Sequence, residues 1–379
     1  MLIFINSSVV DNGDENSWDD ETVLALENLA SARREGKPLV MAKREIFKKI
    51  AQCRRLSQFA RNTYNKLFNQ STQLESTQLE SYLSAVTRYI ELVNSCYEPE
   101  VVSNSGKQII KVAPRFFNDS ELVQKTILLC ENIHDTILYE TIAKIYLVWN
   151  NINIKIVCEG RGGGGNTISL EYINIQELKK RFCLCIVDSD KIAPDGNFGS
   201  TASLIQTQSD SNCINTQTFI LDCREIENLI PNSILSELCS RNQERLKVLK
   251  IFENISSTAF EIRRFLDIKK GTRMKEIINA SNPKIKSFWE VKTSLIPNIS
   301  SSIDDWCQAN WQCSNNSGEC KCKISLGFGE NTLSNTVEYL KHKNPHEIAK
   351  IVDKSMHSDW EKIGQVVMNW CIAGSPIRV

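Results

Sequence analysis

Apolar and polar positions follow two different patterns along the middle of this chain. Short uninterrupted apolar runs, such as 126–130 and 182–187, are typical of strands buried on both faces. Longer stretches at 131–150 and 168–181 carry apolar residues at helical spacing. Strands that alternate with helices over short connections predict a parallel, doubly wound α/β sheet with right-handed crossovers. Further strands are expected at 152–160 and 218–223.

The regions on either side of this sheet show a mostly helical pattern. After a short first strand, a helix is expected at 21–35, because Ser17 or Asp19 can cap its start and Gly36 and Pro38 follow its end. Helices are also expected at 42–68, 81–96, 237–255 and 346–371. The predicted organisation is a helical N-terminal domain at 1–120, an α/β domain at 121–235 and a helical C-terminal region at 236–379.

Composition narrows the class of protein. With 379 residues and 41% apolar content, the chain can form a substantial core and two or three domains. No stretch is apolar for long enough to span a bilayer, and no basic segment precedes the first apolar run, so we expect a cytoplasmic protein without membrane contact. The 14 cysteines are scattered through apolar runs, where thiols act as small hydrophobic groups, so no disulfide framework is expected.

Charge indicates that any contact with nucleic acid is local. The chain has 45 basic and 45 acidic residues, so its net charge is zero and affinity for nucleic acid must come from a patch. The expected helix at 42–68 is strongly basic. A solvated helix face is the alternative explanation of such a run. The candidate nucleic-acid contacts are Lys43, Arg44, Lys48, Lys49, Arg54 and Arg55.

Acidic residues directly follow two of the expected strands. Glu131 comes after the run 126–130, and Asp188 and Asp190 come after 182–187. Alternate residues of a strand share a face, and the carboxyl ends of parallel strands meet at one edge of the sheet, so these carboxylates can converge. Converging carboxylates repel unless a cation lies between them, and Mg²⁺ prefers such oxygen ligands. An Asp-rich turn is the alternative.

Two further features belong to the same predicted edge. Glu225 and Glu227 follow the strand at 218–223 and could add ligands, although acids in the first turn of a helix also complement its dipole. A glycine-rich turn, Gly162–Gly165, follows the second strand. It lacks the Gly-Lys-Ser/Thr of a P-loop, so no ATPase activity is expected. Its glycines would instead let the backbone pass close to the edge.

Four stretches, in this order, resemble a TOPRIM domain. They are CENIHD at 130–135, INIKIVCEGRGGGGN at 152–166, IVDSDK at 186–191 and REIEN at 224–228. The resemblance covers residues 121–235 and is strongest to the nuclease half of the OLD-type (overcoming lysogenization defect) proteins and their relatives in bacterial anti-phage defence. Glu131 and Asp135 match the Glu-Gly-x-x-Asp pattern of that family, while Asn132 stands where a glycine is usual.

The resemblance implies an endonuclease that cuts phosphodiester bonds of DNA or RNA with Mg²⁺ or Mn²⁺. Bound ions would polarise the phosphate and lower the pKa of a water molecule, with Glu131 as a ligand or as the general acid or base. Nuclease members also place a lysine beyond the acids to neutralise charge on the phosphate; a lysine pair before a glycine is otherwise an ordinary helix end. The implied metal ligands are Glu131, Asp135, Asp188, Asp190, Glu225 and Glu227, and the implied catalytic residues are Glu131, Asp188, Asp190, Lys269 and Lys270.

The first acid of the pattern has a second candidate. Glu159 is also followed by a glycine, and it lies nearer to Asp188 in the sequence. If Glu159 were the first acid, however, only one helix would separate it from Asp188, and a strand–helix pair of the family would be missing. Glu131 leaves room for these elements and is the preferred assignment.

A cysteine-rich segment at 307–322 could form a structural zinc site. Four thiolates satisfy the tetrahedral preference of Zn²⁺ and leave no open position for catalysis. The spacing lacks the paired Cys-x2-Cys of common zinc ribbons, so zinc binding stays a hypothesis. The four candidates are Cys307, Cys313, Cys320 and Cys322.

A different class of function is binding without catalysis. Asn132 in place of a glycine and the long polar stretch at 193–217 are compatible with a nucleic-acid-binding or sensor module on a TOPRIM fold. Such a module would show salt-dependent affinity and no cleavage in any divalent ion. Relatives of this kind often work beside a separate ATPase, and the sequence is also compatible with a homo-oligomer.

Overall fold

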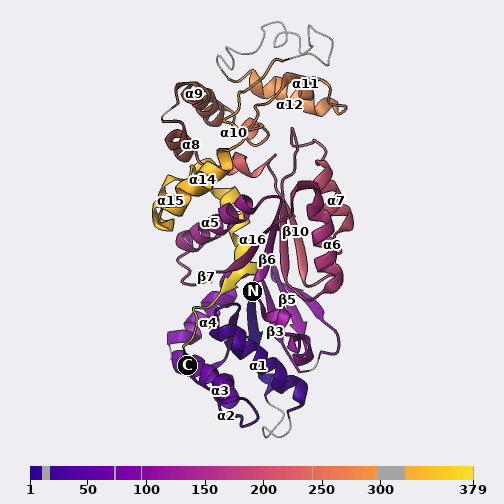
Figure 1. The fold of residues 1–379 in the computed structure, drawn as a ribbon, viewed down its shortest axis with the longest axis vertical. Helices are drawn as coiled ribbons and strands as arrows, with labels where there is room; N and C mark the ends of the chain where they lie inside the picture. The colour runs from indigo at the N-terminus through magenta and orange to yellow at the C-terminus, as the bar shows by residue number, and fades with distance from the viewer. Residues whose placement is uncertain (11–17, 72–73, 95, 241, 297–320, 379) are drawn as a thin grey trace.

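The computed structural model describes residues 1–10, 18–71, 74–94, 96–240, 242–296 and 321–378. The molecule is elongated, with an N-terminal lobe at the bottom of Figure 1, a second sheet with its helices above that lobe, and the helices α8 to α12 at the top. None of the described helices combines the length and the apolar character that a membrane crossing requires.

The middle of the molecule is the predicted parallel sheet. Its spatial order is β10-β9-β6-β8, and every neighbouring pair is parallel. The chain therefore places its second strand on one side of its first strand and its third strand on the other side. A cleft that can receive ligands is expected at such a point, outside the carboxyl ends of the strands. The strands are β6 (Thr126–Cys130), β8 (Cys158–Gly162), β9 (Cys183–Val187) and β10 (Thr216–Ile220).

Helices cover each face of this sheet, which explains why its central strands are apolar without interruption. Every residue of β6 and β9 is buried. Ile127 and Cys185 pack in a cluster with residues of α6 and α7, whereas Leu128 and Ile186 belong to the core on the side of α5 and α16. The prediction of an α/β fold in which helices flank a parallel sheet is confirmed. The helices are α5 (Ile133–Trp149), α6 (Ile168–Leu178), α7 (Ser200–Gln208) and α16 (His357–Cys371).

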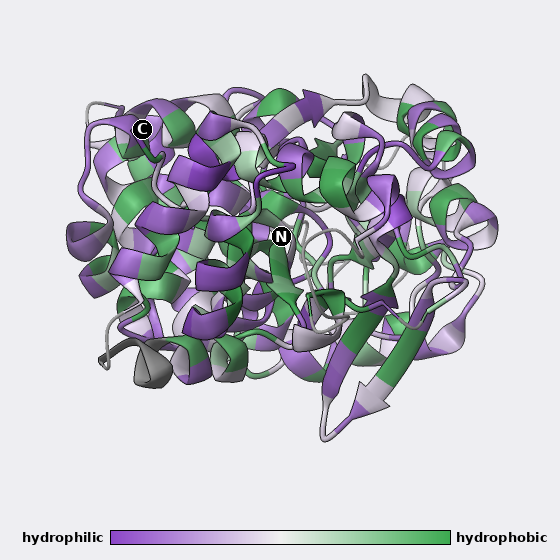
Figure 2. Ribbon diagram, turned by 90° about the horizontal axis from the view of Figure 1, so that it is seen from below, coloured by the Kyte–Doolittle hydropathy of each residue, from purple (hydrophilic) through white to green (hydrophobic). Residues whose placement is uncertain are grey.

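The N-terminal lobe contains a second sheet that the sequence pattern did not predict. Its order is β2-β1-β3-β5-β4, parallel except for the pair β4 and β5. β1 is hydrophobic along its length, as its colour at the label N in Figure 2 shows. The elements are β1 (Leu2–Ile5), α1 (Asp20–Arg34), β2 (Leu39–Ala42), α2 (Arg44–Gln52), α3 (Gln58–Gln70), α4 (Leu74–Ala85), β3 (Arg88–Leu92), β4 (Glu100–Asn104) and β5 (Lys107–Val112).

Two expected helices of this lobe are wrong in detail. The stretch 81–96 is not one helix, because residues from Arg88 onward form β3, in which Arg88, Ile90 and Leu92 are buried at period two. The stretch 42–68 is also interrupted: α2 ends at Gln52, and the hydroxyl of Ser57 caps a new helix by accepting the amide of Ala60 at 3.2 Å. The polar stretch 193–217 contains a helix, α7.

The described part of the C-terminal region, residues 242–296 and 321–378, is mostly helical, and its end returns to the N-terminal lobe. After α16, strand β11 (Ile372–Ala373) pairs antiparallel with β7 (Lys155–Ile156). The amide of Ile377 then donates to the carbonyl of Arg34 at 2.9 Å. The remaining helices are α8 (Asn232–Cys239), α9 (Gln243–Thr258), α10 (Phe260–Arg263), α11 (Met274–Ile278), α12 (Pro283–Thr293), α14 (Thr332–Lys341) and α15 (Pro345–Ile351).

Trp370, at the end of α16, joins the two sheets. Its indole N–H donates to the side chain of Gln217 on β10 at 2.6 Å, and the guanidinium of Arg88 on β3 lies 4.8 Å from its ring centroid. Its carbonyl accepts the hydroxyl of Thr126 on β6 at 2.6 Å. Because the side chain is fully buried, the packing of the two lobes depends on it.

Replacement of Trp370 by alanine should therefore lower the free energy of unfolding by about 3–5 kcal/mol, since a large buried ring is lost and Gln217 loses its partner. Urea unfolding at neutral pH measures the effect. Leu170→Ala is the matched control, because Leu170 is 68% exposed and its truncation should cost less than about 0.5 kcal/mol. Equal costs for the two variants would contradict the role of Trp370.

Candidate active site at the carboxyl edge of the four-stranded sheet

Glu131 and Asp188 leave neighbouring strands at the same edge. β6 ends one residue before Glu131, and β9 ends one residue before Asp188. The two strands are parallel, with Leu129 opposite Cys185, so both acids emerge where the strand order reverses. Both acids therefore follow their strands at the same edge of the sheet.

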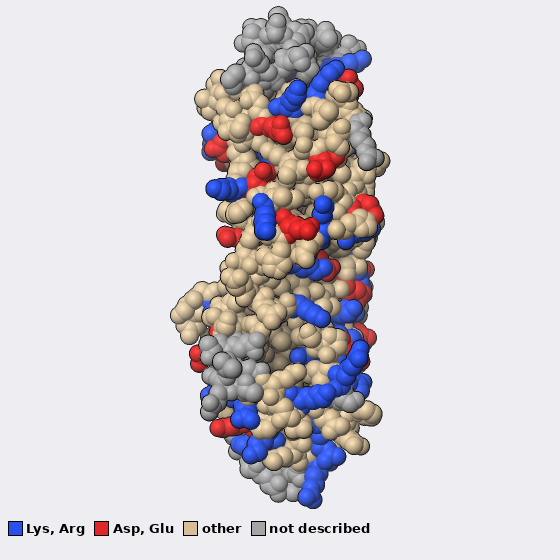
Figure 3. Space-filling view, turned by 90° about the vertical axis from the view of Figure 1, so that its left-hand side faces the viewer, with Lys and Arg blue, Asp and Glu red and all other residues tan. Residues whose placement is uncertain are grey.

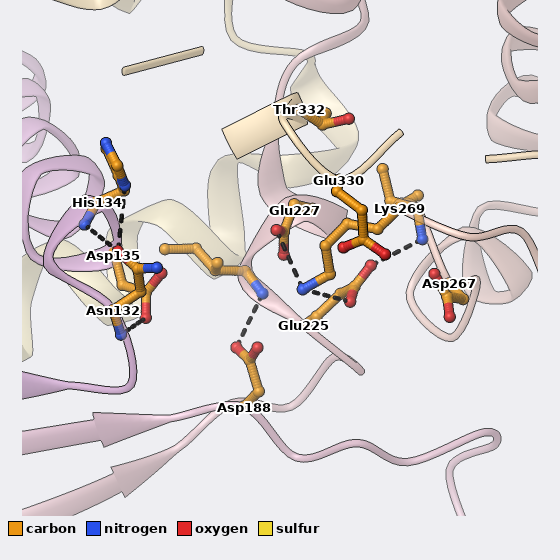
Figure 4. A network of polar contacts seen from close by, with 12 residues as sticks. Asn132, His134, Asp135, Asp188, Glu225, Glu227, Asp267, Lys269, Glu330 and Thr332 are labelled. Carbon is orange, nitrogen blue, oxygen red and sulfur yellow. Dashed lines mark hydrogen bonds and ion pairs between the residues drawn. The ribbon is translucent and has the colours of Figure 1, made fainter. Parts of the chain in front are cut away.

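Asp188 is held in place by the backbone of the following unit. One of its carboxylate oxygens accepts the amide of Ile226 at 2.9 Å, at the start of a 3-10 helix, Ile226–Leu229 (Figure 4). The hydroxyl of Ser189 donates to the carbonyl of Cys223 at 2.6 Å and so ties the exit of β9 to the exit of β10. The second carboxylate oxygen of Asp188 accepts no hydrogen bond from the described residues and is available as a ligand atom.

Glu225 and Glu227 share one lysine. The ammonium of Lys269 lies 3.1 Å from a carboxylate oxygen of Glu225 and 3.2 Å from one of Glu227, and Figure 4 shows it between them. Glu225 also accepts the amide of Ile268 at 2.7 Å. Both glutamates are buried. The predicted metal ligands Glu225 and Glu227 are thus paired with an internal cation, supplied by a residue that was itself predicted to be catalytic.

Asp135 closes a capping box at the start of α5. Its carboxylate accepts the amide of Asn132 at 2.8 Å, while the side chain of Asn132 accepts the amide of His134 at 3.0 Å. Asn132 is thus the N-cap residue of α5, a position that favours asparagine. Asn-x-x-Asp before an apolar helix was a readable signal for this local role.

A second capping box was also missed in the sequence. The side chain of Asn228 accepts the amide of Glu225 at 2.8 Å, and its own amide donates to the carbonyls of Arg263 at 2.8 Å and Leu266 at 2.9 Å. Asn228 thereby connects the turn of Glu225 to the segment that carries Lys269. The Glu-x-x-Asn spacing within REIEN is the signal that could have identified it.

Asp190 lies at the outer side of the edge and is exposed. Its backbone has a left-handed conformation with φ of 54°, and its amide donates to the carbonyl of Arg224 at 2.8 Å. Its carboxylate packs against Gly199, where any side chain would overlap it. Asp190 is close enough to Glu131 for its negative charge to raise the pKa of that carboxyl group.

Burial and mutual repulsion shift the carboxyl groups of this edge in the same direction. Burial is the main cause in each case, and neighbouring carboxylates add to it. The pKa rises to about 7 for Asp135 and for Glu225, and the pKa of Asp188 and of Glu131 is also raised. Burial alone would lower the pKa of Lys269, but Glu225 and Glu227 raise it, so the ammonium stays charged.

The donor set fits a hard divalent cation, but the ligands are not assembled. One carboxylate oxygen of Glu131 and one of Glu227 are buried without a hydrogen-bond partner, which is rare for such atoms. Carboxylate oxygens are the ligands that Mg²⁺ and Mn²⁺ take. Among the residues that the structure describes, however, no three His, Cys, Asp or Glu side chains stand close enough together to hold a metal ion. Binding would therefore require these side chains to move closer together.

Lys270 lies away from the site. Its ammonium is 3.7 Å from Glu330, and 63% of its side chain is exposed, whereas 29% of the side chain of Lys269 is exposed. Of the two predicted lysines, the structure brings only Lys269 to the carboxylates.

Glu159 lies near the amino ends of the strands, on the opposite side of the sheet from the carboxyl edge. Glu159 is paired with Ile127, near the start of β6. β8 continues for three more residues to Gly162, which is paired with Cys130 at the end of β6. Its carboxylate is bound by Arg161 at 2.7 Å and by Arg181 at 2.6 Å. The register therefore favours Glu131 as the acid that accompanies Asp188.

The glycine-rich turn packs beside Glu131. The amide of Gly163 donates to the carbonyl of Cys130 at 2.7 Å, and Gly164 and Gly165 both have positive φ. A side chain on Gly162 would come within 2.9 Å of the backbone nitrogen of Ile133. The glycines thus allow the backbone to pass close to the start of α5, as expected.

The predicted nucleic-acid contacts lie far from these carboxylates. α2 and α3 are at the bottom of Figure 1, whereas the carboxyl ends of β6, β9 and β10 point toward its top. Basic side chains gather over the lower half of the face in Figure 3. Arg55 is paired with Asp20, and the guanidinium of Arg44 lies 4.4 Å from the ring centroid of Phe68. The six residues are all exposed: Lys43, Arg44, Lys48, Lys49, Arg54 and Arg55.

The zinc hypothesis falls outside the described residues for three of its four cysteines, Cys307, Cys313 and Cys320. Cys322 is described, and its carbonyl accepts the amide of Met274 at 3.0 Å.

No protein-family model, no curated protein and no solved structure matches this chain. The functional argument therefore rests on the geometry of the edge itself.

In metal-free buffer, thermal stability should fall as pH rises from about 5 to about 8. Unfolded carboxyl groups have a pKa near 4, so with raised folded values the folded protein binds more protons in this window, and stability decreases with pH. Asp135→Asn keeps an acceptor for the cap but removes one such group, so it should flatten the slope of melting temperature against pH. A melting temperature that rises toward pH 8 would contradict the buried-charge description.

Removal of the ammonium of Lys269 should be strongly destabilising. Lys269→Met leaves Glu225 and Glu227 buried without their cation, which should cost about 3 kcal/mol of unfolding free energy at neutral pH. Lys270→Met is the matched control and should change stability by less than about 0.5 kcal/mol. Urea unfolding compares the two variants, and similar losses would show that the pairing seen here contributes little.

Proposed function

We propose that this protein is a nuclease that uses Mg²⁺ or Mn²⁺ to cut phosphodiester bonds of DNA or RNA. The observation that carries the proposal is the meeting of Glu131 and Asp188 at the point where the strand order of a parallel sheet reverses, with Asp190 beside them. More carboxyl groups than cations are buried there, and a divalent ion would offset that excess.

The arrangement also supports the TOPRIM resemblance. Glu131 follows the first strand of the sheet, the glycine-rich turn follows the second, and Asp188 and Asp190 follow the third, in the order that the resemblance requires. An effector of bacterial anti-phage defence, acting in the cytoplasm and beside a separate ATPase, is the biological role that this resemblance brings with it.

The roles of the side chains follow from what each one contacts. Glu131 and Asp188 would bind the ion through their oxygens that lack hydrogen bonds, and the ion would polarise the phosphate and activate a water molecule. Lys269, held by Glu225 and Glu227 and partly exposed, is positioned to neutralise charge on the phosphate. Asp135 and Asn228 position the two segments that carry these residues.

The second candidate function is nucleic-acid binding without cleavage. One observation favours it: the acids do not form a ready three-ligand group among the described residues, and Lys269 already neutralises Glu225 and Glu227. A protein of this class would bind nucleic acid in a salt-dependent way and leave it intact.

Cleavage of plasmid DNA, total RNA and tRNA in Mg²⁺ and in Mn²⁺ tests the proposal. The wild type should cut at least one substrate, and Asp188→Asn should reduce the rate by about a hundredfold or more, because loss of a ligand removes several kcal/mol of transition-state stabilisation. Glu159→Gln is the control, since Glu159 lies at the opposite edge, and it should cut like the wild type.

Three outcomes separate the candidates. Cutting by Asp188→Asn at the rate of the wild type would overturn the assignment of the site. Binding of the substrates by the wild type, measured by gel shift, without cutting in either ion would favour the binding module. Activity lost in Glu159→Gln but kept in Asp188→Asn would transfer the role to the other edge.

A further inference from the structure

A second site lies in the N-terminal lobe, far from the carboxylates. A cavity of about 610 Å³ lies between β2, the helices α2 to α4, strand β7 and the returning segment 373–376. This volume is typical of sites that hold small molecules. The face with α4 and the C-terminal end in Figure 1 is the one turned to the viewer in Figure 3, where the lower half is hollowed and basic side chains gather.

Arg33 is a buried cation of this cavity that forms no ion pair with the described residues. Its side chain lines the cavity and is 7% exposed, yet its Nε atom has no hydrogen-bond partner. Its guanidinium packs on Gly374 and donates through Nη1 to the carbonyl of Ser375. This bond uses one of the five N–H donors of the guanidinium. In the described part of the chain, no carboxylate lies within ion-pair distance of it, and burial lowers its pKa to about 10.

A buried guanidinium without an anion is costly, because its charge is removed from water and not compensated. The contact with Ser375 holds the returning segment in place, but a neutral amide side chain could do the same. The remaining donors of Arg33 are therefore better explained by an anion that enters the cavity.

Other residues that line the cavity supply further positive charge. α2 has nine residues and begins at the cavity, and its N-cap residue, Lys43, makes no side-chain capping bond. The amide of Ile46 donates to the carbonyl of Lys43, but the amides of Arg44 and Glu45 have no acceptor within the helix and can face an anion, and the helix dipole favours negative charge there. Lys43, Arg44 and Lys155 also line the cavity, against a single acid, Glu80.

The rest of the wall is apolar. Phe47, Leu67 and Tyr82 line the cavity and are buried, and Met41 adds a partly buried thioether. Such a surface favours a ligand with an apolar or aromatic body and disfavours a bare inorganic ion, whose hydration it could not replace.

We propose that this cavity binds a small organic phosphate, of the size of a nucleoside monophosphate, with its phosphate between Arg33 and the first turn of α2 and its body against Phe47 and Leu67. Charge-assisted hydrogen bonds hold the phosphate, and burial of the body adds affinity. The residues Lys43 and Arg44, predicted to contact a nucleic-acid backbone, belong to this small-molecule site. The ligand binds whether or not the distant carboxylates cut nucleic acid.

Isothermal titration calorimetry of the full chain with three probes tests the proposal. Adenosine monophosphate carries both parts of the expected ligand, inorganic phosphate carries the charge alone, and adenosine carries the body alone. Adenosine monophosphate should bind at least about tenfold more tightly than either of the others, because each lacks one set of contacts.

Variants assign the binding to this cavity. Arg33→Gln should weaken binding of adenosine monophosphate by about tenfold or more, since a charge-assisted bond is lost, and Arg44→Gln should weaken it several-fold. Lys48→Gln is the matched control: it makes the same change on exposed α2 surface outside the cavity and should leave the affinity unchanged.

Three results of the titrations would overturn the proposal. The first is no binding of adenosine monophosphate at millimolar concentration. The second is equal affinity for adenosine, which would exclude recognition of the anion. The third is equal affinity for phosphate, which would exclude a role for the apolar wall. If Arg33→Gln fails to fold by circular dichroism, Arg44→Gln and Lys155→Gln decide: unchanged affinity in both would contradict the site, and a loss in both would support it.

Discussion

Buried negative charge at the carboxyl edge of the four-stranded sheet is the constraint on which the rest of this region depends. Burial alone disfavours ionised carboxyl groups, and here several of them face one another. The protein answers with a lysine between Glu225 and Glu227 and with a backbone amide that donates to Asp188. Buried carboxylate oxygens without a hydrogen-bond partner remain on Glu131, where β6 ends, and on Glu227.

Much of this edge could be predicted from the sequence because parallel strands impose it. Once 126–130 and 182–187 are recognised as buried strands, Glu131 and Asp188 must emerge at one side. The partners of the other acids were less accessible. Asp135 and Glu225 belong to capping boxes whose spacing was readable, whereas the pairing of Lys269 depends on the path of a loop more than thirty residues downstream, which no local pattern specifies.

The N-terminal lobe shows where the sequence pattern misled. The residues of β3 alternate between buried and half-buried positions, but the preceding helix carries apolar residues at helical spacing and extends the pattern into the strand. Pairing with β1 and β5 decides the outcome, because tertiary contacts override weak local preference. The break between α2 and α3 was missed for a different reason. Ser57, which caps α3, lies inside a basic run that was interpreted as one continuous helix.

The returning segment 372–377 has a consequence for how the chain folds during synthesis. It pairs with β7 and donates from Ile377 to the carbonyl of Arg34, so it forms one wall of a lobe whose other elements lie more than two hundred residues earlier in the chain. That lobe can collapse early around β1 and α1, but it stays open along this wall until α16 and the residues after it have been made. The N-terminal lobe is therefore completed only by residues that follow α16, and without them the cavity around Arg33 lacks one wall.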